Sequence, residues 1–179
     1  MVSNLISRRN LLRGLRDEAA TLRPPFSQVE TVFVERCDSC GNCIRSCPEK
    51  ILIRGAGGLP QVDFSNGNCT FCAKCADVCD ADAFGTARDI DHAWDLRAVV
   101  SETCLEHKGI SCRACESWCE PRAIRFRPAI GGRSDILLDQ SICTGCGACV
   151  APCPQASITI THTPTGAEQM SPAYTEEIA

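Results

Sequence analysis

Hydrophobic and polar positions divide the chain into a basic amphipathic start, two regions of short strand-like runs and a polar tail. Near the start, apolar residues recur at helical spacing and arginines fall on the other faces, which predicts an amphipathic helix between Ser7 and Pro24. Its apolar positions are Leu11, Leu12, Leu15, Ala19 and Leu22. We expect this face to dock, either on the body of the protein or on a partner.

Two later segments repeat one order of elements. Residues 48–64 and 120–138 each read as a helical turn, a strand, a glycine-rich turn and a second strand, which predicts two β-hairpins. The side chains expected to form the two small cores are Ile51, Ile53, Val62 and Phe64 in one segment, and Ile124, Phe126, Ile136 and Leu138 in the other. Residues 81–100 lack a clear glycine-rich turn, and the acidic residues 164–179 are predicted to be disordered.

The stretch "SRRNLLRGLR" at 7–16 also looks like the opening of a twin-arginine export signal. Such a signal needs an uncharged apolar core of about 7–15 residues after its basic start. Charged residues interrupt this segment at Arg13, Arg16, Asp17, Glu18 and Arg23. No other stretch approaches the roughly 18 apolar residues of a membrane span. The sequence therefore favours a helix over a signal, and a cytoplasmic protein without a membrane span.

Composition then points to metal. The chain of 179 residues contains 16 cysteines, and such density indicates disulfides in a secreted protein and metal in a cytoplasmic one. Its formal net charge is −4, and no basic patch with interleaved aromatic residues suggests nucleic-acid binding. There is also no nucleotide-binding glycine loop and no pairing of nucleophile and base, so we expect no catalytic residues and no enzyme. The histidines His92, His107 and His162 are expected at the surface.

The cysteines fall into four groups of four. Group one is Cys37, Cys40, Cys43 and Cys47; group two is Cys69, Cys72, Cys75 and Cys79; group three is Cys104, Cys112, Cys115 and Cys119; group four is Cys143, Cys146, Cys149 and Cys153. Groups one, two and four have the spacing C-x2-C-x2-C-x3-C, which is the bacterial ferredoxin run for a [4Fe–4S] cluster. The sequence therefore predicts [4Fe–4S] clusters, up to four in number.

This spacing has a physical reason. Three thiolates on one curled loop can face three irons, and backbone N–H groups of the loop can hydrogen-bond the sulfurs. Gly41, Gly145 and Gly147 supply the dihedral freedom that the loops need. The fourth cysteine is expected at the start of a short helix, followed by Pro48 or Pro154, and it ligates the other cluster in two-cluster ferredoxins.

Zinc and disulfides are the alternatives. Structural zinc usually takes two cysteine pairs separated by a dozen or more residues, which does not match three cysteines within seven residues. Group three is less regular, because seven residues separate Cys104 from Cys112. We expect Cys104 to remain a ligand across this inserted loop; otherwise the cluster is labile, three-iron or absent. Group two has Asp80 in place of the proline, and an acidic residue suits a first helical turn.

The fold class predicted is α+β, with two tandem bacterial-type two-cluster ferredoxin modules. The domains are residues 1–30 (helix and linker), 31–88 (module 1), 89–163 (module 2) and 164–179 (tail). The hairpins favour pairing group one with two and three with four, so that the fourth cysteine of each group crosses to its partner; a nested pairing, one with four and two with three, is the alternative. Modules of about sixty residues are marginal on hydrophobic burial alone, so metal–thiolate bonds are expected to provide much of the folding energy.

Several further motifs carry a resemblance to a known family. They are "SRR" near the start, "RPPF" at 23–26, "RGAGG-P" at 54–60, "AWDL" at 93–96 and the irregular group three running into "CEPRAIRFRP". Over about residues 7–160 the chain resembles the NapF family, the ferredoxin-type accessory proteins of periplasmic nitrate reductase. The resemblance implies a cytoplasmic protein that acts in maturation of the catalytic subunit of that reductase before export, through assembly of its [4Fe–4S] cluster.

Two other functions are open at this point. One is an electron-transfer ferredoxin or an electron-wire subunit of another oxidoreductase. The other is a structural zinc module that only binds a partner. Iron and sulfide analysis separates the zinc module from the other two, and transfer of clusters to an apo-acceptor separates a cluster donor from an electron carrier.

Overall fold

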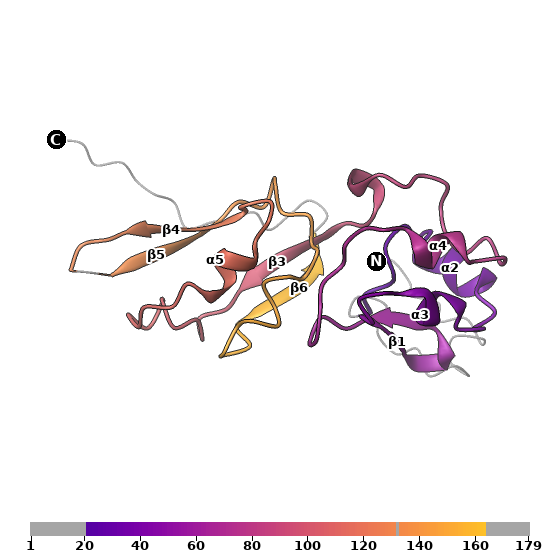
Figure 1. Ribbon diagram of the computed structural model, residues 1–179, viewed down its shortest axis with the longest axis horizontal. Coiled ribbons are helices and arrows are strands. Elements are labelled where there is room, and N and C mark those ends of the chain that lie inside the picture. Colours follow the sequence, from indigo (N-terminus) through magenta and orange to yellow (C-terminus); the bar gives the residue numbers. More distant parts are fainter. Residues whose placement is uncertain (1–20, 132, 164–179) are drawn as a thin grey trace, which may run out of the picture.

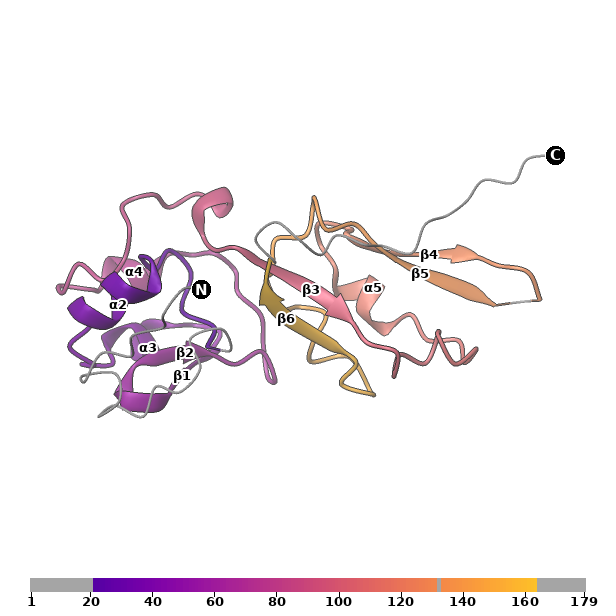
Figure 2. The same cartoon turned by 180° about the vertical axis from the view of Figure 1, so that it is seen from behind.

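The computed structural model describes residues 21–131 and 133–163, which form two lobes lying end to end (Figures 1 and 2). The helices of this part of the chain are α2 (Glu30–Arg36), α3 (Asn42–Ser46), α4 (Lys74–Asp77) and α5 (Ala114–Trp118), with the 3-10 turns η2 (Ala56–Gly58) and η3 (Ile90–His92). The strands are β1 (Leu52–Arg54), β2 (Pro60–Val62), β3 (Leu96–Val100), β4 (Ile124–Pro128), β5 (Ser134–Leu138) and β6 (Ile158–His162). Most of the helix predicted near the N-terminus, and the tail 164–179, lie outside the described residues.

Both predicted hairpins are present. Strands β1 and β2 pair antiparallel with Leu52 opposite Val62, and β4 and β5 pair antiparallel with Ile124 opposite Leu138. In the first hairpin the turn runs through Gly57 and Gly58, whose φ angles of +64° and +78° suit glycine. Short helices beside small antiparallel sheets agree with the α+β class.

Most of the predicted core residues are buried, and one prediction was wrong. Ile51, Val62 and Phe64 are at most 7% exposed, whereas Ile53 is 37% exposed. Leu52 is buried in its place, because successive side chains of a strand point to opposite faces and β1 turns Leu52 inward. In the second hairpin Ile124 and Phe126 are buried, and Ile136 and Leu138 pack partly buried against the same core.

In groups one, two and three a short helix lies before the fourth cysteine, and group four has only turns there, which corrects our expectation that the fourth cysteine begins a helix. Helix α3 ends at Ser46, and Cys47 adopts extended backbone with ψ of 114°. In group two the residue before α4 is Ala73, in the left-handed region, and in group one it is Gly41. The left-handed residue lies directly after the second cysteine and turns the chain there. The single helical turn therefore begins at that point and ends before the fourth cysteine. Pro48 and Asp80 therefore lie in turns rather than in first helical turns.

Residues 21–36 pack into module 1, although the sequence assigned the first ten of them to a linker. The Val62 N–H donates to the Leu22 carbonyl, and Arg23 forms a buried ion pair with Glu30. Ser27 forms an isolated antiparallel bridge with Phe84, and the rings of Phe33 and Phe84 meet edge to face with centroids 5.7 Å apart. The domain boundaries at 31, 89 and 164 themselves stay predictions.

Module 2 is closed by a strand pair that the sequence did not reveal. Strands β3 and β6 pair antiparallel over five residues each, from Leu96 opposite His162 to Val100 opposite Ile158. Their inward residues Leu96, Ala98, Ile158 and Ile160 are all buried. The pair joins the two ends of module 2 in the way that the Ser27–Phe84 bridge joins the two ends of module 1.

Candidate metal centres

All sixteen cysteines lie in the described residues, and none of them forms a disulfide. They assemble into four sets that we call quartets 1 to 4. Quartet 1 is Cys37, Cys40, Cys43 and Cys79; quartet 2 is Cys47, Cys69, Cys72 and Cys75; quartet 3 is Cys104, Cys112, Cys115 and Cys153; quartet 4 is Cys119, Cys143, Cys146 and Cys149. Quartets 2, 3 and 4 each line a separate cavity.

Each quartet takes three thiols from one curled loop and the fourth from the partner group. Cys47 lines the same cavity as Cys69, Cys72 and Cys75, and Cys79 acts electrostatically on Cys37 and Cys43. In module 2, Cys153 lies with quartet 3 and Cys119 with quartet 4. The arrangement agrees with the sequential pairing and not with the nested one.

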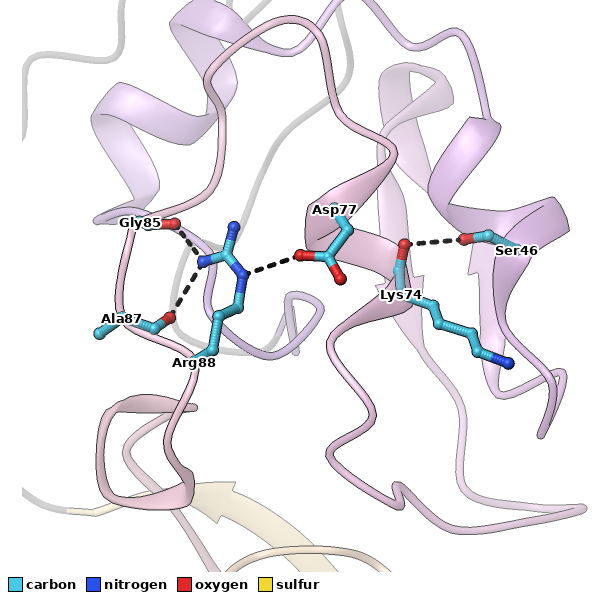
Figure 3. Close-up of polar contacts among 6 residues, drawn as sticks. All are labelled: Ser46, Lys74, Asp77, Gly85, Ala87 and Arg88. Carbon is cyan, nitrogen blue, oxygen red and sulfur yellow. Dashed lines mark hydrogen bonds and ion pairs between the residues drawn. The ribbon is translucent and has the colours of Figure 1, made fainter.

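Short supports hold the two loops of module 1 together. The Ser46 hydroxyl on α3 donates to the Lys74 carbonyl at the start of α4 over 3.3 Å (Figure 3). On the other side of α4, the Arg88 guanidinium pairs with Asp77 at 3.1 Å and donates to the carbonyls of Gly85 and Ala87. The Arg88–Asp77 pair thus joins the chain that leaves module 1 to α4, the helix that carries Cys75.

Backbone geometry at the loops follows the sequence argument. Gly41, Gly145 and Gly147 have φ angles of +77°, +69° and +80°, where side chains are strained. Backbone N–H groups point at sulfurs, as the 3.4 Å contact from Phe71 to Cys69 and the 3.3 Å contact from Ser157 to Cys153 show. The Ser157 hydroxyl also lies 3.1 Å from the Cys153 sulfur. Hydrogen bonds of this kind stabilise negative charge on a ligand sulfur.

Burial makes many of these thiols hard to ionise. It raises the pKa of Cys69, Cys75 and Cys149 to about 12, and that of Cys43 and Cys115 to about 11, with neighbouring thiols adding to each shift. Burial is the largest single effect at Cys153 and opposes its ionisation, but hydrogen bonds from Ser157, Gln155 and Ile158 together outweigh it and lower the pKa of Cys153. Because metal binds the thiolate, loading of the buried positions must release protons.

A residue that sequence reasoning missed organises group three. Glu106, within the inserted loop, is 4% exposed. Its carboxylate accepts a 2.7 Å hydrogen bond from the Cys112 backbone N–H and another of 2.7 Å from the Ser134 hydroxyl of β5. The insertion is therefore an ordered loop that brings Cys104 to quartet 3. His107 of the same loop is exposed, as are His92 and His162, as predicted.

The donor set fits a [4Fe–4S] cluster in each quartet, with one thiolate for each iron. Among the described residues, no three His, Cys, Asp or Glu side chains are arranged to hold a single metal ion. A tetrahedral zinc site would need sulfurs within about 4 Å of one another, since Zn–S bonds are about 2.3 Å long. That each cysteine ligates iron stays a prediction.

The hairpins, short helices and cysteine loops together define tandem ferredoxin modules. In agreement, a family model described as "4Fe-4S dicluster domain" matches residues 36–83 and again residues 108–157. The chain is thus a ferredoxin-type iron–sulfur protein.

Relatives identify the family more closely. Ferredoxin-type protein NapF of Escherichia coli strain K12 is 42% identical over 154 residues, which cover 86% of this chain and 93% of that protein. NapF of Haemophilus influenzae is 41% identical over 139 residues, 78% of each chain. The chain belongs to the NapF family of ferredoxin-type proteins. Methylamine utilization ferredoxin-type protein MauM of Methylobacillus flagellatus is more distant, at 32% identity over 160 residues, 80% of this chain and 68% of that one.

None of the helices in the described part of the chain has the length and apolar character needed to cross a membrane.

Proposed function

We propose that this protein is a cytoplasmic iron–sulfur accessory protein that acts in maturation of the catalytic subunit of periplasmic nitrate reductase before that subunit is exported. In this role it carries up to four [4Fe–4S] clusters in quartets 1 to 4 and helps to assemble the cluster of the catalytic subunit. Membership of the NapF family supports the partner, and the assembly of all sixteen cysteines into four quartets is the observation that carries the role.

The chain's own residues suit an accessory protein better than an enzyme. The cavities of quartets 2, 3 and 4 are lined by cysteines and small or apolar residues, with few other titratable groups. When bound, a cluster supplies one-electron chemistry and a source of iron and sulfide. The protein contributes the thiolates, the backbone N–H groups that stabilise them and the loops that control access.

Access differs among the ligands in a way that favours hand-over from module 1. Cys40 and Cys72, the second cysteines of groups one and two, are exposed, whereas Cys43, Cys69 and Cys75 are buried. An exposed ligand is the one that an incoming thiolate from a partner can displace. We therefore propose that quartets 1 and 2 face the catalytic subunit.

The direct test mixes holo-protein, labelled with an iron isotope, with the apo catalytic subunit under anaerobic conditions. Donation predicts that labelled iron moves to the catalytic subunit faster than it does from an equal amount of free iron and sulfide. If the label stays on this protein while its clusters change redox state, the electron-transfer alternative is right. A colourless protein that contains zinc would support the scaffold alternative.

Docking and location need their own measurements. The arginine-rich segment before residue 21 is proposed to bind the catalytic subunit, so deletion of residues 2–20 should leave the cluster spectrum intact and weaken binding to that subunit. The deletion stops at 20 because Leu22 contacts the module 1 core. Unchanged binding would remove the docking role, and loss of clusters would make the segment structural. Cell fractionation tests the cytoplasmic location.

A further inference from the structure

The cysteine loops of groups two and four meet where the two modules touch. The Cys69 backbone N–H donates a 2.8 Å hydrogen bond to the Cys146 carbonyl oxygen. Cys69 belongs to quartet 2 in module 1, and Cys146 belongs to quartet 4 in module 2. This bond therefore joins the cysteine loop of quartet 2 to the cysteine loop of quartet 4, across the boundary between the modules.

Aromatic packing reinforces this contact. The Trp94 indole N–H donates to the Thr144 carbonyl at 2.9 Å, and the Trp94 ring lies edge to face against Phe64 and Phe71, with centroids 6.0 and 5.6 Å away. A Cβ atom at Gly147 would lie only 2.1 Å from the Phe64 ring, so glycine is what allows the group four loop to approach module 1 this closely.

Exposure of the second cysteines differs between the two modules. The second cysteines of groups one and two, Cys40 and Cys72, are exposed, whereas those of groups three and four, Cys112 and Cys146, are partly buried. Group three is tied inside module 2: Ser101 N–H donates to Ser157, and Glu106 binds both Cys112 and Ser134.

The exchanged fourth cysteines place quartet 1 beside quartet 2 and quartet 3 beside quartet 4, and the Cys69–Cys146 hydrogen bond places quartet 2 beside quartet 4. Cys43 of quartet 1 acts electrostatically on Cys75 of quartet 2, and Cys146 acts on Cys69. Within module 2, Cys115 of quartet 3 acts on Cys149 of quartet 4. The spatial order is thus 1, 2, 4, 3, whereas the order of the three-cysteine loops along the chain is 1, 2, 3, 4.

We propose that clusters held in the four quartets form a single electron relay in the order 1, 2, 4, 3, with the Cys69–Cys146 contact as the junction between modules. At each step one electron leaves a reduced cluster, which is oxidised, and reduces its oxidised neighbour, with no bond or proton transferred. A one-electron donor outside the chain reduces the cluster at one end of the relay, and a one-electron acceptor outside the chain oxidises the cluster at the other end. The inference needs bound clusters, as the proposed function does, but it does not depend on a nitrate reductase partner.

Two matched variants of the full chain test the order. Cys112→Ala removes a ligand of quartet 3 and Cys143→Ala a ligand of quartet 4, and iron analysis checks that each loses one cluster. The proteins are reduced with dithionite and their electron paramagnetic resonance spectra are compared. With quartet 3 gone, the remaining clusters stay contiguous and every signal is broadened by its neighbour. With quartet 4 gone, quartet 3 is isolated and contributes an uncoupled signal of about one third of the spins.

Every other pattern overturns the relay order. An uncoupled signal only in Cys112→Ala would place the junction at quartet 3. An uncoupled signal in both variants would mean that the modules do not couple. No uncoupled signal in either variant would mean that quartet 3 contacts module 1 directly. None of these spectra bears on cluster donation, which the isotope transfer measures separately.

A second pair of variants leaves all cysteines in place, in case one of the first pair loses more than one cluster. Phe64→Ala removes the ring that packs on Gly147, and Phe126→Ala removes a ring of similar burial in β4. We expect full iron content in both proteins, with weakened coupling between the modules only in Phe64→Ala. Equal spectra from the two variants would overturn the proposal.

Discussion

At the scale of single residues, two polar side chains distinguish quartet 3 from the others. Glu106 is a buried carboxylate in the inserted loop of group three. It accepts hydrogen bonds from the Cys112 N–H and the Ser134 hydroxyl, which hold this loop in place. Ser157 places a hydroxyl beside the Cys153 sulfur. The positions four residues after the other fourth cysteines are Ile51, Ala83 and Ala123, which have no hydroxyl.

Glu106→Ala should selectively remove the quartet 3 cluster. It leaves the Cys112 N–H without its carboxylate acceptor, and losing a hydrogen bond to a buried charged group costs about 1.5–3 kcal/mol. Glu106→Gln should retain the cluster, since the amide keeps an oxygen for the Cys112 N–H and can donate to Ser134. Iron content and visible absorbance after anaerobic purification give the readout. Equal cluster loss in Gln and Ala variants would mean that the charge, and not the hydrogen bonds, matters.

Ser157→Ala should lower the reduction potential of one cluster, the one in quartet 3. Hydrogen bonds to ligand sulfurs stabilise the reduced, more negative state and raise the potential. The matched variant Ala123→Ser offers a hydroxyl near Cys119, and should raise the potential of the quartet 4 cluster. Both shifts are read from redox titrations followed by electron paramagnetic resonance. A titration of Ser157→Ala that superimposes on the wild type would show that the hydroxyl does not tune the cluster.

At the scale of elements, the Arg23–Glu30 ion pair is a central contact of the segment that packs into module 1 before α2. Arg23 is 8% exposed; its guanidinium binds the Glu30 carboxylate at 2.6 and 2.8 Å, donates to the Pro60 carbonyl and lies 5.4 Å from the Phe33 ring centroid. It thus connects the chain entering the module to the first turn of α2 and to the end of the β1–β2 hairpin.

Arg23→Ala should destabilise module 1 strongly. Removing one partner of a buried pair costs about 3–5 kcal/mol, and the partial exposure of Glu30 places the expected loss near the lower end. For a module of this size that corresponds to a fall of roughly 10 °C or more in the anaerobic unfolding temperature measured by circular dichroism. The control is Arg127→Ala, whose pair with Asp135 is exposed and 3.8 Å long, and which should change little. Similar effects of both variants would place Arg23 outside the folded core.

At the scale of the whole molecule, the cores depend on the cysteines themselves. Cys43, Cys69, Cys75, Cys115 and Cys149 are buried among the apolar core residues. The strands around them are only three to five residues long, too short to hold a fold of this size alone. We therefore expect cluster bonds to replace much of what a larger hydrophobic core provides.

Chelation or oxidative destruction of the clusters should unfold residues 31–160 cooperatively. Without iron, the buried thiols remain but lose the bonds that tie each loop to its partner loop. Circular dichroism and limited proteolysis before and after iron removal measure the change, and anaerobic reconstitution should restore both signals. Native-like dichroism and protease resistance in the iron-free protein would show that the hydrophobic core suffices.

The sequence by itself determined the chemistry and the local architecture of this protein. Spacing of the cysteines, the left-handed glycines at 41, 145 and 147, and the two glycine-turn hairpins are all local in the chain, so patterns of a few residues encode them. The crossing of each fourth cysteine could be inferred too, because the ferredoxin run links ligand position to cluster pairing. Local patterns wrongly predicted that Ile53 is buried and that a helix begins at the fourth cysteine. The geometry of the cysteine loops instead places the helices before Cys47 and Cys79.

Only the tertiary structure decided the relations between distant segments. The pairing of β3 with β6 joins residues about sixty positions apart, and the burial of Glu106 depends on Ser134 of another element. Between the two modules, the order of the quartets in space depends on the contact of Cys69 with Cys146, which no spacing rule predicts. Such contacts depend on how distant segments pack. A single sequence contains no local signal for them, because the two residues of each contact lie far apart in the chain.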